Sequence, residues 1–123
     1  MMNLNQEESD FSFPSRRHRI RKHRDFQAFF KSEGALSTGV VNTSFGWIRF
    51  RKNDLGYLRI AVSVSKKVSK KSTVRNRLKR VCSELLRLKK NDLKGYDIWV
   101  FIKFHTENVR EELESAISKI YSM

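Results

Sequence analysis

Most of the side chains that could bind a partner are lysines and arginines, and they fall between residues 66 and 94. That segment holds twelve Lys or Arg against two acids, Glu84 and Asp92, so it carries +10 of the total net charge of +13. Charge concentrated in one place attracts a polyanion, and lysine or arginine in such a cluster displaces counterions from phosphates. The segment therefore predicts a surface that binds a polyanion, with nucleic acid as the leading candidate.

A helix over about 72–90 is expected to present these charges on one side. Its apolar residues recur at helical spacing and form one buried stripe: Val74, Leu78, Val81, Cys82, Leu85 and Leu86. The remaining side forms a basic face: Arg75, Asn76, Arg77, Lys79, Arg80 and Arg87. Ser72 or Thr73 is expected to cap the helix. Asn76 adds no charge, and a base edge, a 2′-hydroxyl and a neighbouring backbone group are all open as its partner.

Composition excludes several other classes of function. The chain of 123 residues suits one domain, and its lone Cys82 lies on the apolar stripe, which predicts a buried thiol in a reducing compartment. No apolar run approaches the roughly 20 residues of a membrane span. The three histidines have no metal-ligand spacing, and no acids pair as a catalytic dyad would. We expect a cytoplasmic protein without membrane contact, with residues 1–15 as a disordered tail and 16–123 as the folded domain.

The remaining elements predict a single-domain α+β sandwich of two layers. A short helix is expected over 23–32, and strands over 40–51 and 57–65 are expected to pair as an antiparallel hairpin. A further short strand is possible within 35–40. The nearly apolar run 96–104 is typical of an interior strand, and 106–121 predicts a final helix with acids near its start.

The stretch from residue 59 to residue 80 resembles the signature of bacterial ribonuclease P protein components. In that family a strand ending in SVSKK leads through a basic turn to VRNRxKR at the start of a long helix; here these are residues 63–67 and 74–80. Residues 24–30 resemble the family's first helix and 95–98 its last strand, so the likeness extends over about 100 residues. Ala61 and Ser69 stand where glycine is common, and Ser69 leaves open whether the turn takes a glycine-like backbone.

The resemblance implies a protein subunit of ribonuclease P, the ribonucleoprotein endonuclease that removes the 5′ leader of precursor tRNA. The catalytic RNA and precursor tRNA are then the partners, with one protein per RNA. Chemistry resides in the RNA with bound Mg²⁺, so no catalytic residue and no metal ligand is expected in this chain. The implied fold has the order αβββαβα, like the second domain of a small-subunit ribosomal protein. Its parallel strands are joined by a left-handed crossover, an exception to the usual hand.

Two sites follow from this resemblance together with the charge pattern. The catalytic RNA is expected to contact the following residues: Lys66, Lys67, Lys70, Lys71, Arg75, Asn76, Arg77, Lys79, Arg80 and Arg87. Phe26 and Phe30 share a helix face, and periodicity alone favours a core role for both. The family's matching aromatics instead line a cleft for the single-stranded leader, which leaves Phe29 in the core and adds Phe45 to the cleft. Unpaired bases stack on aromatic rings with little sequence preference.

Other interpretations remain at this point. The basic block at residues 16–24 is either a solvated arm or an added phosphate contact: Arg16, Arg17, Arg19, Arg21, Lys22 and Arg24. The charge pattern also suits a ribosomal-type RNA-binding protein. A DNA-binding protein that places the 72–90 helix in a major groove is weaker, because no short helix precedes it at helix-turn-helix spacing.

Overall fold

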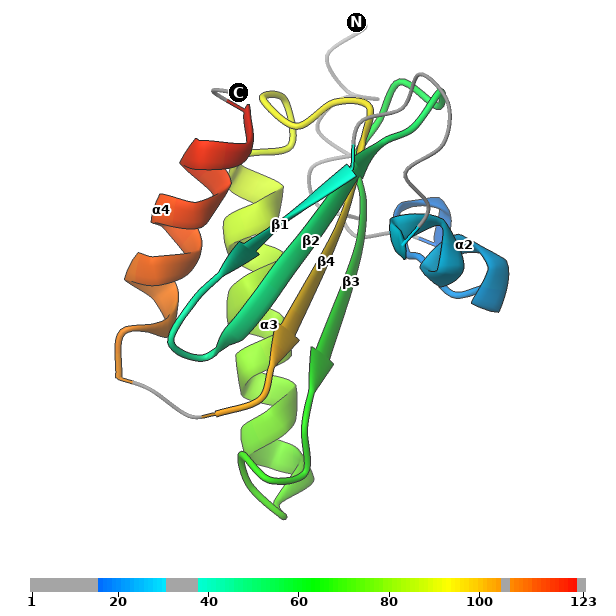
Figure 1. Ribbon diagram of the computed structural model, residues 1–123. Coiled ribbons are helices and arrows are strands. Elements are labelled where there is room, and N and C mark those ends of the chain that lie inside the picture. The colour runs from blue at the N-terminus through cyan, green and yellow to red at the C-terminus, as the bar shows by residue number, and fades with distance from the viewer. Residues whose placement is uncertain (1–15, 31–37, 105–106, 122–123) are drawn as a thin grey trace, which may run out of the picture.

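The computed structural model describes residues 16–30, 38–104 and 107–121, which form a four-stranded sheet with helices packed against it (Figure 1). The elements in chain order are η1 (Arg16–His18), α2 (His23–Gln27), η2 (Ala28–Phe30), β1 (Thr38–Asn42), β2 (Gly46–Lys52), β3 (Arg59–Val64), α3 (Ser72–Leu88), β4 (Tyr96–Ile102) and α4 (Val109–Tyr121). This order is that of the predicted α+β sandwich. The tail expected over 1–15 lies outside the described residues.

The strands are arranged in the order β1-β2-β4-β3. β2 pairs antiparallel with β1 and with β4, whereas β3 pairs parallel with β4. The hairpin expected between 40–51 and 57–65 is therefore wrong, because β4 lies between β2 and β3. β4 is the most continuously apolar strand and has the most buried residues of the four strands. It lies between β2 and β3 and pairs with both of them. Its prediction as an interior strand is confirmed.

A turn divides the single strand that was expected over 40–51. The amide of Thr43 donates to the carbonyl of Gly46 at 3.0 Å, and the amide of Gly46 donates to Oγ1 of Thr43 at 3.1 Å. Glycine is required at position 46 because a Cβ there would lie 2.1 Å from the carbonyl oxygen of Phe101. The short strand expected within 35–40 overlaps β1 at residues 38–40, and its remaining residues, 35–37, lie outside the described residues.

The core lies between the sheet and the two long helices, α3 and α4 (Figure 1). From β4, Ile98, Val100 and Ile102 are fully buried on this side. Burial of each such side chain contributes about 1.5–3 kcal/mol. Of the predicted helical stripe, Cys82, Leu85 and Leu86 are buried and Val74, Leu78 and Val81 are half-buried. Desolvation raises the pKa of the Cys82 thiol to about 12, as befits the predicted structural thiol.

The helices are somewhat shorter than their sequence patterns. α2 ends at Gln27 and continues as one 3₁₀ turn to Phe30, while α4 begins at Val109 and α3 ends at Leu88. The predicted ends at 31–32 and 106 lie outside the described residues. α3 connects the parallel neighbours β3 and β4, and the left hand of that crossover stays a prediction.

Candidate nucleic-acid interface

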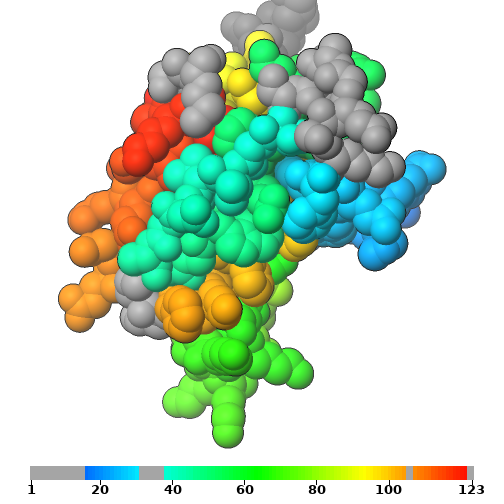
Figure 2. Space-filling view, viewed as in Figure 1, coloured from blue at the N-terminus to red at the C-terminus, as the bar shows by residue number. Residues whose placement is uncertain are grey.

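The turn before α3 and the first half of that helix project from the body of the molecule (Figure 2). We call this surface the α3 basic face; its exposed members are Lys66, Lys67, Lys70, Lys71, Asn76, Arg77, Lys79 and Arg80. Lys71 is the N-cap residue and no side chain caps the helix, so the cap expected from Ser72 or Thr73 is wrong. The first turn also has no acid. The partial positive charge of the helix end therefore adds to that of the lysines.

The two remaining members of the predicted RNA-binding set are half-buried and already have partners. Arg75 donates through Nη1 to the carbonyl of Ser69 at 2.8 Å, so it fastens the turn to the helix. Arg87 donates through Nε to Oε1 of Glu84 at 3.2 Å, and this hydrogen bond lowers the pKa of Glu84. Both arginines belong to the charged surface, but each is less available than Arg77 or Arg80.

Serine side chains stabilise the turn that carries the lysines. Oγ of Ser65 accepts from the amide of Lys67 at 3.2 Å, and Oγ of Ser69 accepts from the amide of Lys71 at 3.1 Å. No described residue other than glycine has a positive φ. Ser69 therefore does not adopt a glycine-like backbone, and its hydroxyl supplies a local hydrogen bond that glycine could not make.

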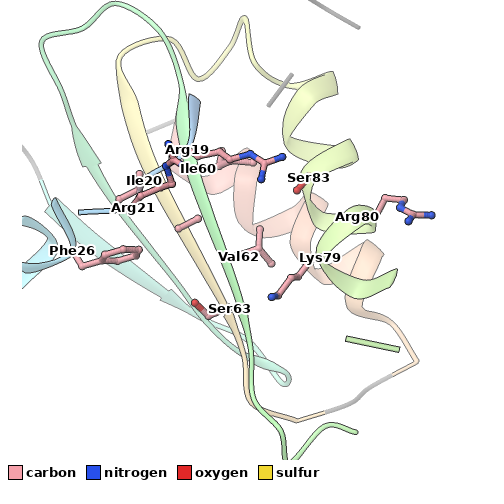
Figure 3. A pocket seen from close by; sticks show the side chains of 11 residues that line it. Arg19, Ile20, Arg21, Phe26, Ile60, Val62, Ser63, Lys79, Arg80 and Ser83 are labelled. Carbon is pink, nitrogen blue, oxygen red and sulfur yellow. The ribbon is translucent and has the colours of Figure 1, made fainter. Parts of the chain in front are cut away.

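A groove of about 520 Å³ runs around the outer edge of β3 and brings the two basic blocks together. On one side are Arg19 and Arg21, anchored where the amide of Ile20 donates to the carbonyl of Ile60 at 2.9 Å. On the other side are Lys79 and Arg80 of α3. Figure 3 shows Arg19 extending toward α3 and Lys79 extending toward β3. The N-terminal block is thus positioned beside the α3 basic face rather than remote from it.

The side of the sheet that faces away from α3 and α4 carries a cluster of aromatic rings, and we call this side the open face. The cluster consists of Phe26, Phe29, Phe30, Trp47, Trp99 and Phe101. Trp99 lies at its centre, with ring centroids 4.7 Å from Phe26 and 4.8 Å from Trp47. Phe30 is 60% exposed and Phe26 is half-buried, whereas Phe29 is buried as predicted. Exposed aromatic surface of this kind suits the stacking of unpaired bases.

Phe45 does not belong to this surface. Its side chain is fully buried in the core, and its carbonyl accepts hydrogen bonds from the amides of Lys103 and Phe104. The expectation that Phe45 joins the cleft is therefore wrong. The resemblance placed Phe45 on the strand expected over 40–51, but β2 begins at Gly46, so Phe45 lies in the preceding turn and its side chain is not held on the side of Trp47.

The aromatic floor of the open face was missed in the sequence, although a signal was present. Trp99 and Phe101 alternate along β4 with the core residues of that strand, and Trp47 lies opposite Phe101 in the β2–β4 register. The indole Nε1 of Trp99 donates to Oγ of Ser63 on β3 at 3.1 Å. Three strands therefore hold the central ring in place.

A buried carboxylate fixes the strands of the open face to one another. Asp97 is fully buried, and its Oδ2 accepts from Arg51 at 2.9 Å and from Arg59 at 2.7 Å. Its Oδ1 accepts from Nε of Arg59 at 2.9 Å and from Asn53 at 2.7 Å. The hydrogen bond to Asp97 raises the pKa of Arg59. Nη1 of Arg59 also lies 3.6 Å from Oδ2 of Asp25 in α2. This ion pair connects the helix that bears Phe26 to the sheet.

The acidic side chains do not form a metal site within the part of the chain that the structure describes. No group of three or more His, Cys, Asp or Glu in these ranges could hold a metal ion. The oxygens of Asp97 already accept from two arginines and an asparagine, so this carboxylate does not fit Mg²⁺, which requires unoccupied oxygen ligands. Among the described helices, none is long and apolar enough to cross a membrane.

Comparison with known proteins assigns the fold and the family. A profile of the Ribonuclease P family matches residues 13–122. The ribonuclease P protein component of Thermotoga maritima is 34% identical over 116 residues, covering 86% of this chain and 94% of the relative. That of Clostridium botulinum is 37% identical over 103 residues, covering 80% and 86%.

Solved structures agree with this assignment. The ribonuclease P protein of Thermotoga maritima superposes with a TM-score of 0.62 at 29% identity, over 85% of this chain and 96% of that one. A Staphylococcus aureus ribonuclease P protein mutant gives a TM-score of 0.69 at 24% identity, over 89% and 92%, which shows the shared fold. The family match spans both the α3 basic face and the open face, and it displaces the ribosomal-type and DNA-binding alternatives. The chain belongs to the bacterial ribonuclease P protein family, whose members are the protein subunit of the endoribonuclease that matures the 5′ end of tRNA with a catalytic RNA.

Proposed function

We propose that the α3 basic face docks onto the catalytic RNA while the open face binds the 5′ leader of precursor tRNA. The groove around β3 carries this proposal, because its lining includes Lys79 and Arg80 of α3 and also Phe26 of the aromatic cluster. A strand of RNA leaving the α3 basic face along this groove reaches the aromatic cluster without crossing an acidic surface. Docking and substrate binding are then adjacent parts of one continuous surface.

For the catalytic RNA, the proposed contacts are those of the α3 basic face, with Arg75 and Arg87 at its margins. Arginine can donate to two phosphate oxygens at once, and a helix presents such side chains at fixed intervals. Asn76 is exposed among these arginines, which favours a contact with RNA over a purely internal role. Arg19 and Arg21 extend the same surface, so we include the N-terminal basic block in the interface.

For the leader, the proposed contacts are Phe26 and Phe30 together with Trp47 and Trp99 of the sheet. Stacking on such rings contributes about 1–3 kcal/mol per base and does not depend strongly on base identity. A subunit that handles many precursor tRNAs requires this tolerance, because their leaders differ in sequence.

Four further parts of the proposal concern the assembly and its setting. We expect Mg²⁺ in the holoenzyme to be bound mainly by the RNA, and one protein to bind each catalytic RNA. Residues 16–123 are proposed as the RNA-binding domain. We expect the holoenzyme in the cytoplasm, where a chain with a single buried thiol encounters a reducing environment.

Reconstitution tests the function. The purified protein is added to its cognate catalytic RNA at low Mg²⁺, and cleavage of a precursor tRNA with a leader of several nucleotides is measured. The protein is expected to stimulate cleavage, because its positive surface neutralises phosphates that Mg²⁺ would otherwise screen. A lack of stimulation would contradict the proposal.

A matched control separates specific docking from bulk charge. The double variant Lys52→Gln/Arg110→Gln removes two exposed positive charges outside both proposed surfaces. It is expected to stimulate cleavage like the unmodified protein, whereas Arg77→Ala/Arg80→Ala is expected to require a higher protein concentration.

A further inference from the structure

Three arginines of the strands lie on the open face, and they differ in whether an acid neutralises their charge. Arg51 and Arg59 both donate to the buried carboxylate of Asp97. Arg49, two residues before Arg51 on β2, lies opposite Trp99 in the β2–β4 register and forms no ion pair with any acid in the described ranges. Its charge is therefore not neutralised by the protein segments that surround it here.

Aromatic rings surround the guanidinium of Arg49. Its Cζ lies 4.3 Å from the centroid of the Phe30 ring and 5.2 Å from that of Trp47. Its Nε is buried and has no hydrogen-bond partner among the described residues, and it is the one side-chain nitrogen or oxygen there with this property. Most buried polar atoms in proteins are hydrogen-bonded, so an atom without a partner requires an explanation.

Cation–π contact explains only part of this arrangement. A cation–π contact satisfies the charge of the guanidinium but none of its N–H donors, which lie in the plane of the group. Donors arranged in such a plane match the oxygens of a phosphate. Phe30 is 60% exposed and Arg49 is half-buried, so a ligand reaches this guanidinium at its Nη groups, while the buried Nε stays behind them.

We propose that Arg49 binds a backbone phosphate of the single-stranded leader, between bases that stack on Phe30 and on the tryptophans. This inference rests on the proposed leader-binding function of the open face and adds a residue and a chemical group to it. The cleft then recognises the leader through one phosphate and adjacent ring faces, neither of which depends on base identity. Arg51 and Arg59 cannot take this role, because Asp97 already holds them.

The experiment uses holoenzyme reconstituted with the catalytic RNA and a set of precursor tRNAs. Each substrate carries one neutral methylphosphonate in place of a leader phosphate, and binding is measured for the unmodified protein and for Arg49→Gln. With the unmodified protein, one position is expected to weaken binding about tenfold, the equivalent of one charge-assisted hydrogen bond. With Arg49→Gln, the same substitution is expected to cause no further loss.

This coupling distinguishes a phosphate contact from a structural role. A variant that merely loosens Phe30 weakens binding to every modified and unmodified leader alike, and additive losses at all positions would overturn the inference. Arg49→Lys retains the charge but not the planar donors, so an intermediate loss is expected. Lys52→Gln removes the same charge from an exposed site three residues along β2, and should leave the methylphosphonate pattern unchanged.

The outcomes also separate this inference from the function on which it rests. If Phe26→Ala weakens binding of leader-bearing substrate and Arg49→Gln does not, the phosphate contact is refuted and the leader cleft stands. If leader length has no effect on binding to the unmodified holoenzyme, both are refuted. Mature tRNA without a leader should bind equally to the unmodified protein and to Arg49→Gln.

Discussion

The α3 basic face and the open face differ in how their charges are satisfied. On the α3 basic face the lysines and arginines extend into solvent, and the few partners they have are local, such as Glu84 for Arg87. On the open face two of three arginines are held by a single buried carboxylate, and the aromatic rings contact one another around Trp99. The α3 basic face thus presents exposed, charged side chains, whereas the open face presents side chains that are held by contacts with one another.

This difference indicates different physical controls on binding. Contacts between exposed cations and phosphates weaken steeply with salt, because binding releases counterions. Stacking on rings depends less on salt and more on whether the rings are held at the right spacing. Each prediction below alters one of the two surfaces and measures the property that this surface is expected to control.

The largest expected effect follows from removing the carboxylate of the open face. Asp97→Ala leaves the half-buried Arg51 and Arg59 without their shared anion, which should lower the free energy of unfolding by up to about 3 kcal/mol, because both guanidinium groups keep some contact with solvent. Urea denaturation measures this loss. Asp92→Ala, which removes an exposed acid, is the control and should change stability little. Equal losses for the two variants would show that Asp97 does not stabilise the sheet.

The next effect concerns the α3 basic face alone. Arg77→Ala/Arg80→Ala should weaken docking to the catalytic RNA by about tenfold per arginine. It should also reduce the slope of log affinity against log salt by roughly one per arginine. The comparison with Lys52→Gln/Arg110→Gln corrects for net charge. An unchanged slope would mean that these arginines do not contact phosphates.

A smaller, substrate-specific effect is expected on the aromatic cluster. Phe26→Ala should reduce binding of a long-leader precursor by about 1–3 kcal/mol, the contribution of one stacked base, and should spare mature tRNA. Holoenzyme affinities for both substrates give the comparison. Tyr121→Ala, at an exposed aromatic of α4, should affect neither substrate. Equal losses for both substrates would rule out the cleft assignment.

The smallest effect should come from Glu84, the acid beside the α3 basic face. Glu84→Gln removes the ion pair that holds Arg87, so docking to the catalytic RNA should tighten slightly and its salt slope should steepen. The gain should be smaller than the loss caused by Arg77→Ala, because the pair is exposed and screened. Titration of docking at several salt concentrations detects it, and weaker docking would indicate that Glu84 orients Arg87 productively.

The sequence predicts the α3 basic face better than the open face, and the reason is locality. The helix that carries Arg77 and Arg80 follows from apolar residues three and four apart, which lie within a single element. Trp99 and Asp97 acquire their roles from strands β2 and β3, which are more than thirty residues away in the sequence. Such roles depend on strand order and register, and the expected hairpin of β2 with β3 had that order wrong.

Phe45 illustrates the limit of alternation as a signal. A period of two assigns a side to each residue only while the chain remains extended, and the turn at 43–46 interrupts it one residue before β2 begins. The family resemblance predicts a leader-binding role for Phe26 and Phe30 without this information. It gave no indication of Arg49, whose significance comes from a buried nitrogen that only the packed structure reveals.

The alternation of side chains along β4 limits which mutations this strand tolerates. Its even-numbered residues from Ile98 to Ile102 face the core, whereas Trp99 and Phe101 face the proposed leader site. Substitutions at these two sets are therefore separable, because the first set affects folding and the second affects the proposed leader surface; Asp97, buried between Arg51 and Arg59, belongs with the residues that affect folding. A deletion or insertion of one codon within β4 would exchange the two sets at once. Point mutations at Trp99 and Phe101 can therefore alter the proposed leader surface without disturbing the core, whereas a change in the length of β4 would disturb both.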